Sequence, residues 1–302
     1  MSAPRVLVTG AAGQLGRDLL AAFSGQVPPG GRRRALLGPE GPGPGVDAVG
    51  ASHDELPVEG REGVLEAVRA LRPDVVVHAA AWTAVDACEL DPERAYRVNA
   101  LGTRHVAEAA SAVGAHLVYV STDYVFDGTA TRPYLEWDEP RPVSVYGASK
   151  LAGERECPPQ ATVVRTSWVC GASGSNLVRT ALRLADAGGP LRFVDDQRGV
   201  PTFAADLSAA VVTLALDRRP GVHHVTNQGA TTWYGLVRAA LEAAGRDPGA
   251  VVPITTAELD PPRPARRPAY SVLDNAALRL GTLPLLPDWR DGLARLVAVL
   301  QP

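Results

Sequence analysis

The amino-acid sequence predicts an α/β fold built on a doubly wound parallel sheet, and two patterns support this prediction. Short apolar runs rich in β-branched residues, typical of parallel strands buried on both faces, alternate along the first half of the chain with segments of helical periodicity. A strand-like run over residues 5–9 leads directly into a glycine-rich turn and then into a helical pattern. With 302 residues, 46% of them hydrophobic and 21% charged, the chain is long enough for one large or two modest globular domains.

The expected elements follow one another in a regular order. Strands are predicted near residues 5–9, 46–49, 75–78 and 116–120, with helices near 17–23, 62–71 and 93–113 between them. Farther along, strands are predicted near 162–169, 191–194 and 222–225, with helices near 176–187, 204–216 and 234–244. Gly and Pro crowd residues 25–45 around Arg32, Arg33 and Arg34, so a surface loop is expected there, and a connector rich in Pro and Arg occupies residues 261–268.

The glycine-rich turn has the spacing G-x-x-G-x-x-G, with glycines at positions 10, 13 and 16. Glycines between a strand and a helix let the backbone approach a pyrophosphate, whose charge the helix N-terminus stabilises. A glycine turn without a ligand is the alternative interpretation. The turn predicts a Rossmann-type dinucleotide-binding domain over residues 1–170, with return segments near residues 199–228. Residues 171–302 are expected to form mainly a smaller C-terminal substrate-binding lobe over the carboxyl ends of the strands.

Composition narrows the classes of partner. A net charge of −3 and a pI near 6.1 give no electrostatic footprint for nucleic acid or an anionic membrane. The longest apolar stretch, residues 75–82, is too short to span a bilayer, and the chain starts without a signal-peptide pattern, so we expect a cytoplasmic protein. It is expected to be a monomer or a homodimer. Cys88, Cys157 and Cys170 lack metal-ligand spacing and are interpreted as thiols in a reducing compartment, with no metal site expected.

Lys150 is the only lysine in the chain, and it stands four positions after Tyr146. On a helix, positions i and i+4 share one face, so the phenol and the ammonium can act at one site. A nearby cation stabilises phenolate and lowers the pKa of a tyrosine. An ordinary surface helix with a chance Tyr/Lys pair is the alternative.

Hydroxyl groups follow the strand predicted at residues 116–120, in Ser121-Thr122-Asp123. In an open α/β sheet the carboxyl end of a strand faces the ligand crevice. A Ser-Thr pair alone is more often a turn or a helix cap. Together with Tyr146 and Lys150, however, Thr122 completes a Thr/Tyr/Lys set that indicates catalysis.

This set, with the three glycines and Asn99, resembles the extended short-chain dehydrogenase/reductases that act on nucleotide sugars. Longer strings narrow the resemblance to the dTDP-4-dehydrorhamnose reductase family, among the dTDP-4-keto-6-deoxyhexose reductases. They are Gly13-Gln14-Leu15-Gly16, residues 79–86 (AAAWTAVD), residues 121–128 (STDYVFDG), residues 146–154 (YGASKLAGE), residues 165–169 (RTSWV) and residues 271–274 (SVLD). The resemblance extends from about Val6 to Asp274.

The resemblance implies a role for each matching residue. Tyr146 would protonate the sugar carbonyl oxygen, Lys150 would hold the nicotinamide ribose and tune Tyr146, and Thr122 would hydrogen-bond the carbonyl region. Cofactor contacts are implied for Gly10, Gly13, Gln14, Leu15, Ala79, Ala80, Ala81, Tyr146 and Lys150. Substrate contacts are implied for Val85, Thr122 and Trp168. Asp123 and Arg267 are also expected to bind the substrate, the latter because an arginine of the Arg266-Arg267 pair can donate to the pyrophosphate of a nucleotide sugar.

The reaction implied is the NAD(P)H-dependent reduction of the C4 keto group of a dTDP-4-keto-6-deoxyhexose. NADPH is the expected cofactor, with NADH possible, because the second strand ends in Gly50-Ala51-Ser52 without the acidic residue that binds a ribose 2′-hydroxyl. Arg17 or the run Arg32 to Arg34 is a candidate partner for a 2′-phosphate.

Two departures from the family pattern bear on ligand contacts. Residues 55–59 (ELPVE) stand where the family usually has Asp-x-Thr/Ser-Asp near the adenine, and Tyr270 stands at a common asparagine position over the substrate.

The same fold also supports other functions, of which the sequence argues against one and leaves two as alternatives. Dehydration is not expected, because Asp123-Tyr124 lacks the second carboxylate of the Asp-Glu pair that follows the catalytic Thr in the related dehydratases. Epimerisation and a non-catalytic regulatory subunit that binds nucleotide remain alternatives.

Overall fold

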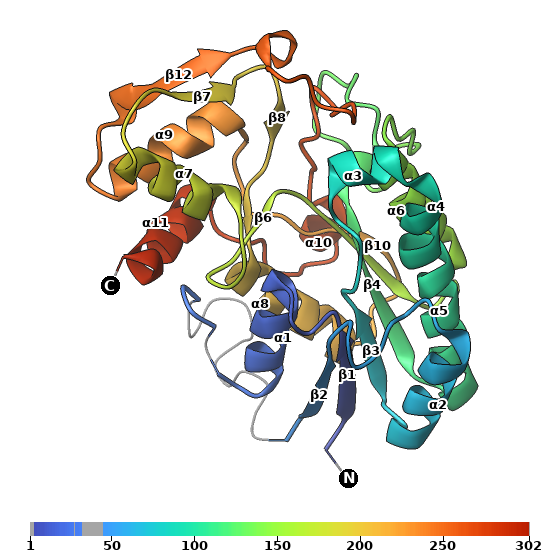
Figure 1. Cartoon of the computed structure of the whole chain (residues 1–302). Coiled ribbons are helices and arrows are strands. Elements are labelled where there is room, and N and C mark those ends of the chain that lie inside the picture. The colour runs from blue at the N-terminus through green and yellow to red at the C-terminus, as the bar shows by residue number, and fades with distance from the viewer. Residues whose placement is uncertain (1–2, 27, 32–44, 302) are drawn as a thin grey trace.

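The computed structural model describes residues 3–26, 28–31 and 45–301. Most of the loop expected at residues 25–45, including Arg32, Arg33 and Arg34, therefore lies outside the described residues. The main sheet of the described chain has six strands in the order β10-β5-β4-β3-β1-β2, all parallel (Figure 1). Its strands are β1 (Arg5–Thr9), β2 (Asp47–Ala51), β3 (Val75–His78), β4 (His116–Thr122), β5 (Thr162–Thr166) and β10 (Gly221–His224).

The strand order reverses between β1 and β3, since the chain goes from β1 to β2 on one side and then returns to place β3 on the other. Ligands of open α/β sheets bind at such a switch point, outside the carboxyl ends of the strands. The predicted Rossmann-type doubly wound parallel sheet is confirmed.

Helices cover both faces of the sheet (Figure 1). On one face lie α1 (Gln14–Phe23) and α8 (Ala204–Leu216), and on the other α2 (Arg61–Leu71), α5 (Gly102–Val113) and α6 (Val145–Glu156). Because side chains alternate along a strand, Val6 and Val8 pack in the core under α1 and α8, whereas Leu7 packs in the core under α2 and α5. The continuous apolar runs seen in the sequence are thus buried on both sides.

A second group of elements surrounds its own core, above and beside the sheet in Figure 1. We call it the second lobe. Its helices are α7 (Leu177–Asp186), α9 (Trp233–Ala243) and α11 (Trp289–Leu300), packed with the parallel pair β7 (Leu191–Val194) and β12 (Val251–Ile254). Two short pairs lie between the lobe and the sheet, β6 (Val169–Cys170) with β9 (Thr202–Phe203) and β8 (Arg198–Gly199) with β11 (Thr231–Thr232).

The remaining helical segments are short. They are α3 (Val85–Leu90), α4 (Pro92–Tyr96), the π-helical turn η1 (Arg97–Leu101), α10 (Ala276–Leu280) and the 3₁₀ turns η2 (Asp123–Val125), η3 (Pro248–Ala250) and η4 (Thr256–Glu258).

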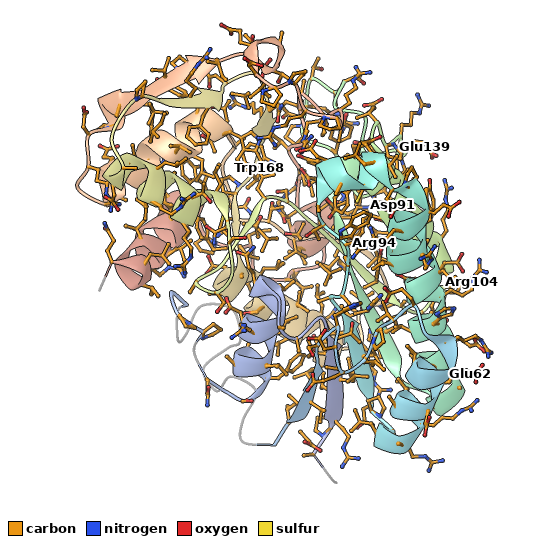
Figure 2. All side chains as sticks on the ribbon, viewed as in Figure 1. Glu62, Asp91, Arg94, Arg104, Glu139 and Trp168 are labelled. Carbon is orange, nitrogen blue, oxygen red and sulfur yellow. The ribbon has the colours of Figure 1, made fainter. Side chains whose placement is uncertain are left out.

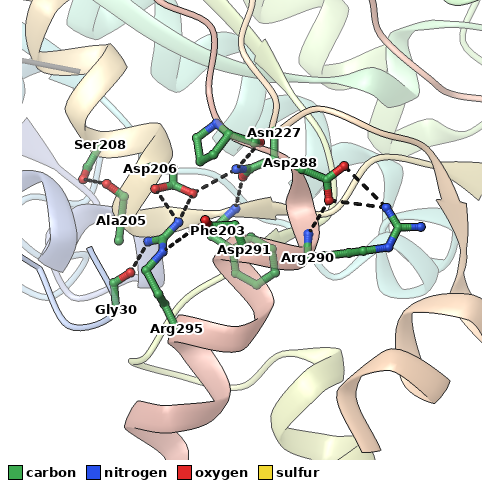
Figure 3. Close-up of polar contacts among 11 residues, drawn as sticks. Gly30, Phe203, Ala205, Asp206, Ser208, Asn227, Asp288, Arg290, Asp291 and Arg295 are labelled. Carbon is green, nitrogen blue, oxygen red and sulfur yellow. Dashed lines mark hydrogen bonds and ion pairs between the residues drawn. The ribbon is translucent and has the colours of Figure 1, made fainter. Parts of the chain in front are cut away.

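A buried ion pair fastens the second lobe to the sheet (Figure 3). Arg295 of α11 pairs with Asp206 near the start of α8, with 2.7 Å between Nη2 and Oδ2, and Asp206 is only 3% exposed. Arg295 also pairs with Asp291 and donates to the carbonyl of Gly30. Asn227, just after β10, donates to the same Asp206 carboxylate over 2.9 Å. The C-terminal helix is therefore tied to α8, which packs on the sheet, and Asp206 links it in turn to the segment after β10.

Several expected elements differ from the structure. The helix expected at residues 93–113 is divided into α4, η1 and α5, because the π turn inserts a wider loop of backbone at Asn99. The strand expected at residues 162–169 stops at Thr166, since Trp168 adopts a left-handed backbone with φ of 46°. Helix α1 begins at Gln14 rather than Arg17, and α11 and β12 were not predicted.

Candidate active site

A cavity of about 560 Å³ opens at the carboxyl edge of the sheet, beside the switch point. Its lining joins the turn after β1, the segment after β3, the end of β4, helix α6 and the turn after β5. The predicted site residues that line it are Gly10, Gly13, Gln14, Leu15, Ala79, Ala80, Ala81, Thr122, Tyr146, Lys150 and Trp168. Val85, Asp123 and Arg267, although described by the structure, are not part of this lining.

The glycine turn leaves no room for side chains. Gly10 has φ of 69°, and a Cβ there would stand 2.7 Å from the amide nitrogen of Ala80. A Cβ at Gly16 would overlap the carbonyl oxygen of Gly10. Since Gly13 caps α1 and the first turn, Gln14 to Arg17, contains no acidic residue, the helix N-terminus keeps amide groups for an anion. The turn therefore fits the pyrophosphate of a dinucleotide.

Lys150 is buried beneath the cavity. Its Nζ donates to the carbonyl of Val120 over 2.7 Å and lies 4.1 Å from the centre of the Tyr119 ring. Burial lowers the pKa of Lys150 to about 7, because few polar groups replace the water that a charged ammonium needs. The Val120 carbonyl therefore fixes the position of the Lys150 ammonium, and with a pKa of about 7 the charged and neutral forms are both present near neutral pH.

Tyr146 lies on the same helix, one turn before Lys150. Its ring packs edge-on against Tyr124, with 5.9 Å between ring centres. Burial raises the pKa of Tyr146 above its usual range. The expectation that Lys150 would lower this pKa is corrected here, because the Lys150 ammonium bonds Val120 and desolvation dominates at the phenol. A phenol that keeps its proton at neutral pH is in the state that a proton donor needs.

Thr122 stands at the end of β4 and caps the turn η2. Its hydroxyl accepts from the amide of Tyr124 over 3.2 Å and donates to Oδ1 of Asp123 over 3.1 Å. Gly147 lets α6 approach this turn, since a Cβ there would overlap the carbonyl oxygen of Tyr124. The close approach of α6 to η2 brings Tyr146 and Thr122 to the same wall of the cavity.

Asp123 lies behind Thr122 rather than in the cavity. It is 2% exposed, and burial raises its pKa to about 7. Among the described residues its second carboxyl oxygen has no hydrogen-bond partner. The predicted direct contact of Asp123 with substrate thus has no counterpart in the cavity lining, while its bond to Thr122 orients that hydroxyl.

Asn99 occupies the π turn and links three segments. Its Oδ1 accepts from the Trp82 amide over 2.8 Å, and its Nδ2 donates to the Trp82 carbonyl over 3.1 Å and to Ser149 Oγ over 3.0 Å. Asn99 therefore fixes the segment after β3 against the helix that carries Tyr146 and Lys150. The residue was seen in the sequence, but its π-helical backbone was not.

His78, at the end of β3, is a buried residue that the sequence interpretation missed. Its Nδ1 lies 2.7 Å from Thr9 Oγ1 and its Nε2 lies 3.2 Å from Thr103 Oγ1. Burial lowers the pKa of His78 to about 3, so the ring stays neutral. It ties the end of β1 to the end of β3 and so holds the Ala79 backbone beside Gly10.

Trp168 lines the cavity from the turn after β5, between the sheet and the second lobe (Figure 2). Its ring is stacked on Trp233 of α9, with ring centres 3.5 Å apart and planes inclined by 9°. A Cβ at Gly199 would stand 2.6 Å from the indole, so this glycine makes room for it. One face of the Trp168 ring is thus covered by Trp233. The predicted packing against a sugar or base can use only the part of the ring that Trp233 does not cover.

Arg267 is held by the protein itself. Its guanidinium forms a two-pronged ion pair with Asp86, with 2.7 Å between Nη2 and Oδ2, and donates to the Ala265 carbonyl. The side chain is only 8% exposed. The ion pair fastens the connector at residues 261–268 to α3, which begins at Val85. Arg267 therefore does not stand as a free donor for a substrate pyrophosphate.

Arg94, Trp82 and residues beyond the end of β2 also contribute to the lining. The Arg94 guanidinium lies 4.6 Å from the centre of the Trp82 ring, and both residues line the cavity. Figure 2 labels Arg94. Leu56, Val58 and Glu59 line it beyond the end of β2. Within the described residues we find no group of three or more His, Cys, Asp or Glu side chains arranged for a metal ion, and no helix long and apolar enough to cross a membrane.

The fold places the chain in the class of Rossmann-type proteins. A match to the family described as RmlD substrate binding domain spans residues 4–301, and the chain belongs to this family. A dTDP-4-dehydrorhamnose reductase of Streptomyces griseus is 42% identical over 299 residues, covering 96% of this chain and 92% of the relative. The resemblance found in the sequence is confirmed.

Two other relatives add to this. A probable dTDP-4,6-dihydroxy-2-methyloxan-3-one 4-ketoreductase of Streptomyces antibioticus is 41% identical over 296 residues, covering 96% of this chain and 93% of its own. The crystal structure of a Bacillus anthracis dTDP-4-dehydrorhamnose reductase in complex with NADP superposes with a TM-score of 0.88 at 35% identity, covering 99% of both chains.

Proposed function

We propose that this protein reduces the C4 keto group of a dTDP-4-keto-6-deoxyhexose, as a dTDP-4-dehydrorhamnose reductase or a close deoxysugar counterpart, with NADPH as the reductant. The observation that carries the proposal is the placement of Thr122, Tyr146 and Lys150 on one wall of a cavity that also contains the glycine turn. A ketoreductase needs a hydride donor, a proton donor and a group that positions the carbonyl. The cavity offers a place for each.

The cofactor would lie across the switch point. Gly10, Gly13, Gln14 and Leu15 would hold its pyrophosphate with backbone amides at the start of α1. Ala79, Ala80 and Ala81 would pass along its ribose and nicotinamide, and Lys150 would bind the ribose hydroxyls. NADPH, when bound, supplies the hydride.

The protein's own residues handle the proton and the carbonyl. Tyr146 would donate its phenolic proton to the C4 oxygen, in keeping with the raised pKa that burial gives this phenol. Thr122 would hold the carbonyl region, with its hydroxyl oriented by Asp123. Val85 and Trp168 remain the proposed direct substrate contacts, whereas Asp123 would act through its bond to Thr122 and Arg267 through the ion pair that fastens the connector to α3. Val85, Asp123, Trp168 and Arg267 are thus the four proposed substrate-side residues. Of these four, Trp168 has the most direct support because it lines the cavity.

Several features support NADPH over NADH. Strand β2 ends at Ala51 and Ser52 follows, so the strand end itself has no acidic residue for a ribose 2′-hydroxyl. The Glu55 carboxylate, which lies beside this end, is engaged by the backbone because it accepts from the Ser52 amide over 2.7 Å. Arg17 is exposed on α1 and remains a candidate for the 2′-phosphate. The B. anthracis relative was crystallised with NADP.

The names of the relatives support a class of substrates and do not single out one sugar. Two relatives of nearly equal identity, 42% and 41%, carry the names of reductases for different dTDP-keto sugars. The proposal is therefore the C4 reduction of a thymidine-diphospho keto sugar, in the cytoplasm and by a monomer or homodimer. The free thiols of Cys88, Cys157 and Cys170 in the described chain agree with a reducing compartment.

The decisive experiment mixes the protein with NADPH and a dTDP-4-keto-6-deoxyhexose and follows absorbance at the nicotinamide band. Stoichiometric loss of NADPH with formation of a dTDP-6-deoxyhexose is the expected result. An epimerase would rearrange the sugar without net NADPH loss, and a regulatory subunit would bind without turnover. Equal reduction of a free keto sugar without the nucleotide would contradict the assignment, since much of the binding energy is expected from the nucleotide.

A further inference from the structure

The side chain of Gln14 leaves the glycine turn and bonds the segment at residues 171–176, which follows β6 and leads to α7. Its Oε1 accepts from the Gly171 amide over 2.9 Å and from Asn176 Nδ2 over 3.1 Å. Its Nε2 donates to the Ser175 carbonyl over 3.1 Å. The sequence interpretation gave Gln14 a role at the cofactor alone, but all three bonds cross to residues more than 150 positions away.

Two glycines make this contact possible. A Cβ at Gly171 would lie 3.3 Å from the Gln14 Cβ, and a Cβ at Gly174, where φ is 72°, would lie 3.0 Å from the Gln14 Cγ. The backbone at residues 171–174 therefore comes close to the side chain of Gln14. A larger residue at either position would push the two segments apart.

The segment that Gln14 holds connects the substrate side of the cavity to the second lobe. It starts after β6, which follows Trp168, and it ends at Asn176, whose Oδ1 caps α7 by accepting from the Arg179 amide over 3.0 Å. Asn176 also donates to the Gly171 carbonyl over 2.7 Å, so the segment is closed on itself. A shift of this segment would move both the β6 end and the start of α7.

We propose that Gln14 is a positioning residue that couples the cofactor site to the nucleotide-sugar site. Its backbone amide belongs to the helix N-terminus where the cofactor pyrophosphate would lie, and its side chain holds the segment beside Trp168. A pyrophosphate that orders the turn orders the segment as well, so each ligand binds more tightly when the other is present. This inference rests on the proposed function.

The test measures NADPH binding by titration calorimetry with and without dTDP, and dTDP binding with and without NADPH. Coupling is reciprocal, so both orders of addition give the same factor in the wild type, which we expect to be roughly tenfold. Gln14→Leu keeps the backbone amide and removes all three bonds. The readout is the ratio of a ligand's affinities with and without the other ligand, which can be compared whatever the variant's affinity for either ligand alone, and we expect this factor to fall close to one in Gln14→Leu.

Asn176→Asp is the matched variant on the other side. It keeps the oxygen that caps α7 but removes the donor to Gln14, so its coupling factor should also fall. The double variant should lose no more coupling than Gln14→Leu alone, because the Asn176 bond is one of the three bonds that Gln14→Leu already removes. Gln14→Glu keeps the acceptor and loses only the bond to Ser175, and we expect an intermediate factor. Ser24→Ala removes an exposed side-chain bond at the far end of α1 and should leave the factor unchanged.

The outcomes separate the two proposals. Failure of the wild type to bind NADPH or dTDP at all would count against the proposed function. Binding of both ligands without coupling in the wild type, or full coupling in both Gln14→Leu and Asn176→Asp, would overturn the role of Gln14. Circular dichroism identifies any variant that does not fold. If Gln14→Leu does not fold, an intermediate coupling factor in Gln14→Glu supports the role of Gln14, and a wild-type factor overturns it.

Discussion

The two walls of the cavity are built in different ways. The sheet wall consists of residues at the carboxyl ends of parallel strands in fixed register, so that Thr122 of β4 stands beside Thr166 of β5, together with Tyr146 and Lys150 of the helix α6 that packs on the sheet. The wall toward the second lobe is made by Trp168, which has a left-handed backbone, and by Val169 of the two-residue strand β6, and side-chain bonds such as those of Gln14 hold the segment that follows. Under the proposed function, the difference teaches that strand pairing and the packing of α6 position the catalytic groups, whereas side-chain contacts position the groups on the substrate side.

The largest expected effect falls on the sheet wall. Tyr146→Phe removes the proton donor but keeps the ring that packs on Tyr124. The rate of reduction should fall by about 10²–10⁴, the range for a lost general acid. NADPH affinity, measured by fluorescence titration, should stay within about twofold of wild type, because the phenol is not part of the pyrophosphate turn. Near-normal turnover would remove Tyr146 from the proposed mechanism.

The contrast between the walls also explains what the sequence could predict. The glycine turn, the Thr/Tyr/Lys set and the main strands follow from patterns within a few residues, such as a glycine after a strand or an i, i+4 pair. The Arg267 to Asp86 ion pair joins residues 181 positions apart, and two-residue strands have no periodicity to detect. Contacts of this kind depend on the completed fold.

Helix α11, which was not predicted, has a recognisable pattern in the sequence. Helix α11 begins after Asp288, which caps it, and Trp289, Leu293 and Leu296 recur at helical spacing. This pattern predicts a capped amphipathic helix. By contrast, the π turn at Asn99 and the left-handed Trp168 have no marker in a single sequence, because neither residue type favours the backbone it adopts.

The second prediction concerns the stability of the sheet wall. Arg165 of β5 and Glu154 of α6 form a buried ion pair, 2.7 Å between Nη2 and Oε2, with side chains 4% and 7% exposed. Glu154→Gln leaves a buried guanidinium without its counter-charge, and the free energy of unfolding should fall by about 3–5 kcal/mol. Chemical denaturation measures this.

The matched control is Glu156→Gln on the same helix. Its partner Arg104 is 61% exposed, so the loss should be only about 0–1 kcal/mol. Equal losses in the two variants would contradict the view that the sheet wall depends on its buried contacts.

The third prediction uses the pKa of Lys150 in the cofactor-free protein. The folded protein releases this proton at about pH 7, whereas the unfolded chain holds it up to the ordinary lysine value of 10.5. Between these values the unfolded state binds more protons, so the free energy of unfolding should rise with pH, by up to about 1.4 kcal/mol per pH unit. The buried thiols of Cys157 and Cys170, whose pKa burial raises from 9.0 to about 12, act in the opposite direction above pH 9.

The comparison is therefore made between about pH 7 and pH 9. Lys150→Met removes the titrating group and should flatten the rise, as followed by denaturant midpoints at each pH. A rise that persists unchanged in Lys150→Met would show that the ammonium keeps its charge in the folded protein and that the sheet wall accommodates it without cost.

The smallest expected effect falls on the wall toward the second lobe. Trp233 supports Trp168 by stacking on it, and its Nε1 donates to Gln197 over 3.2 Å. Stacked aromatic pairs contribute about 0.5–1.5 kcal/mol beyond their burial, so Trp233→Leu should raise the KM for the nucleotide sugar by roughly twofold to tenfold. Its kcat and its NADPH affinity should change little, since neither depends on where the Trp168 ring lies. Trp137→Leu is the control, because that tryptophan is 68% exposed and lies outside the cavity lining of the described residues. An equal loss of NADPH affinity in Trp233→Leu would mean that the two walls do not divide cofactor from substrate, and that the side-chain contacts of the second lobe position both.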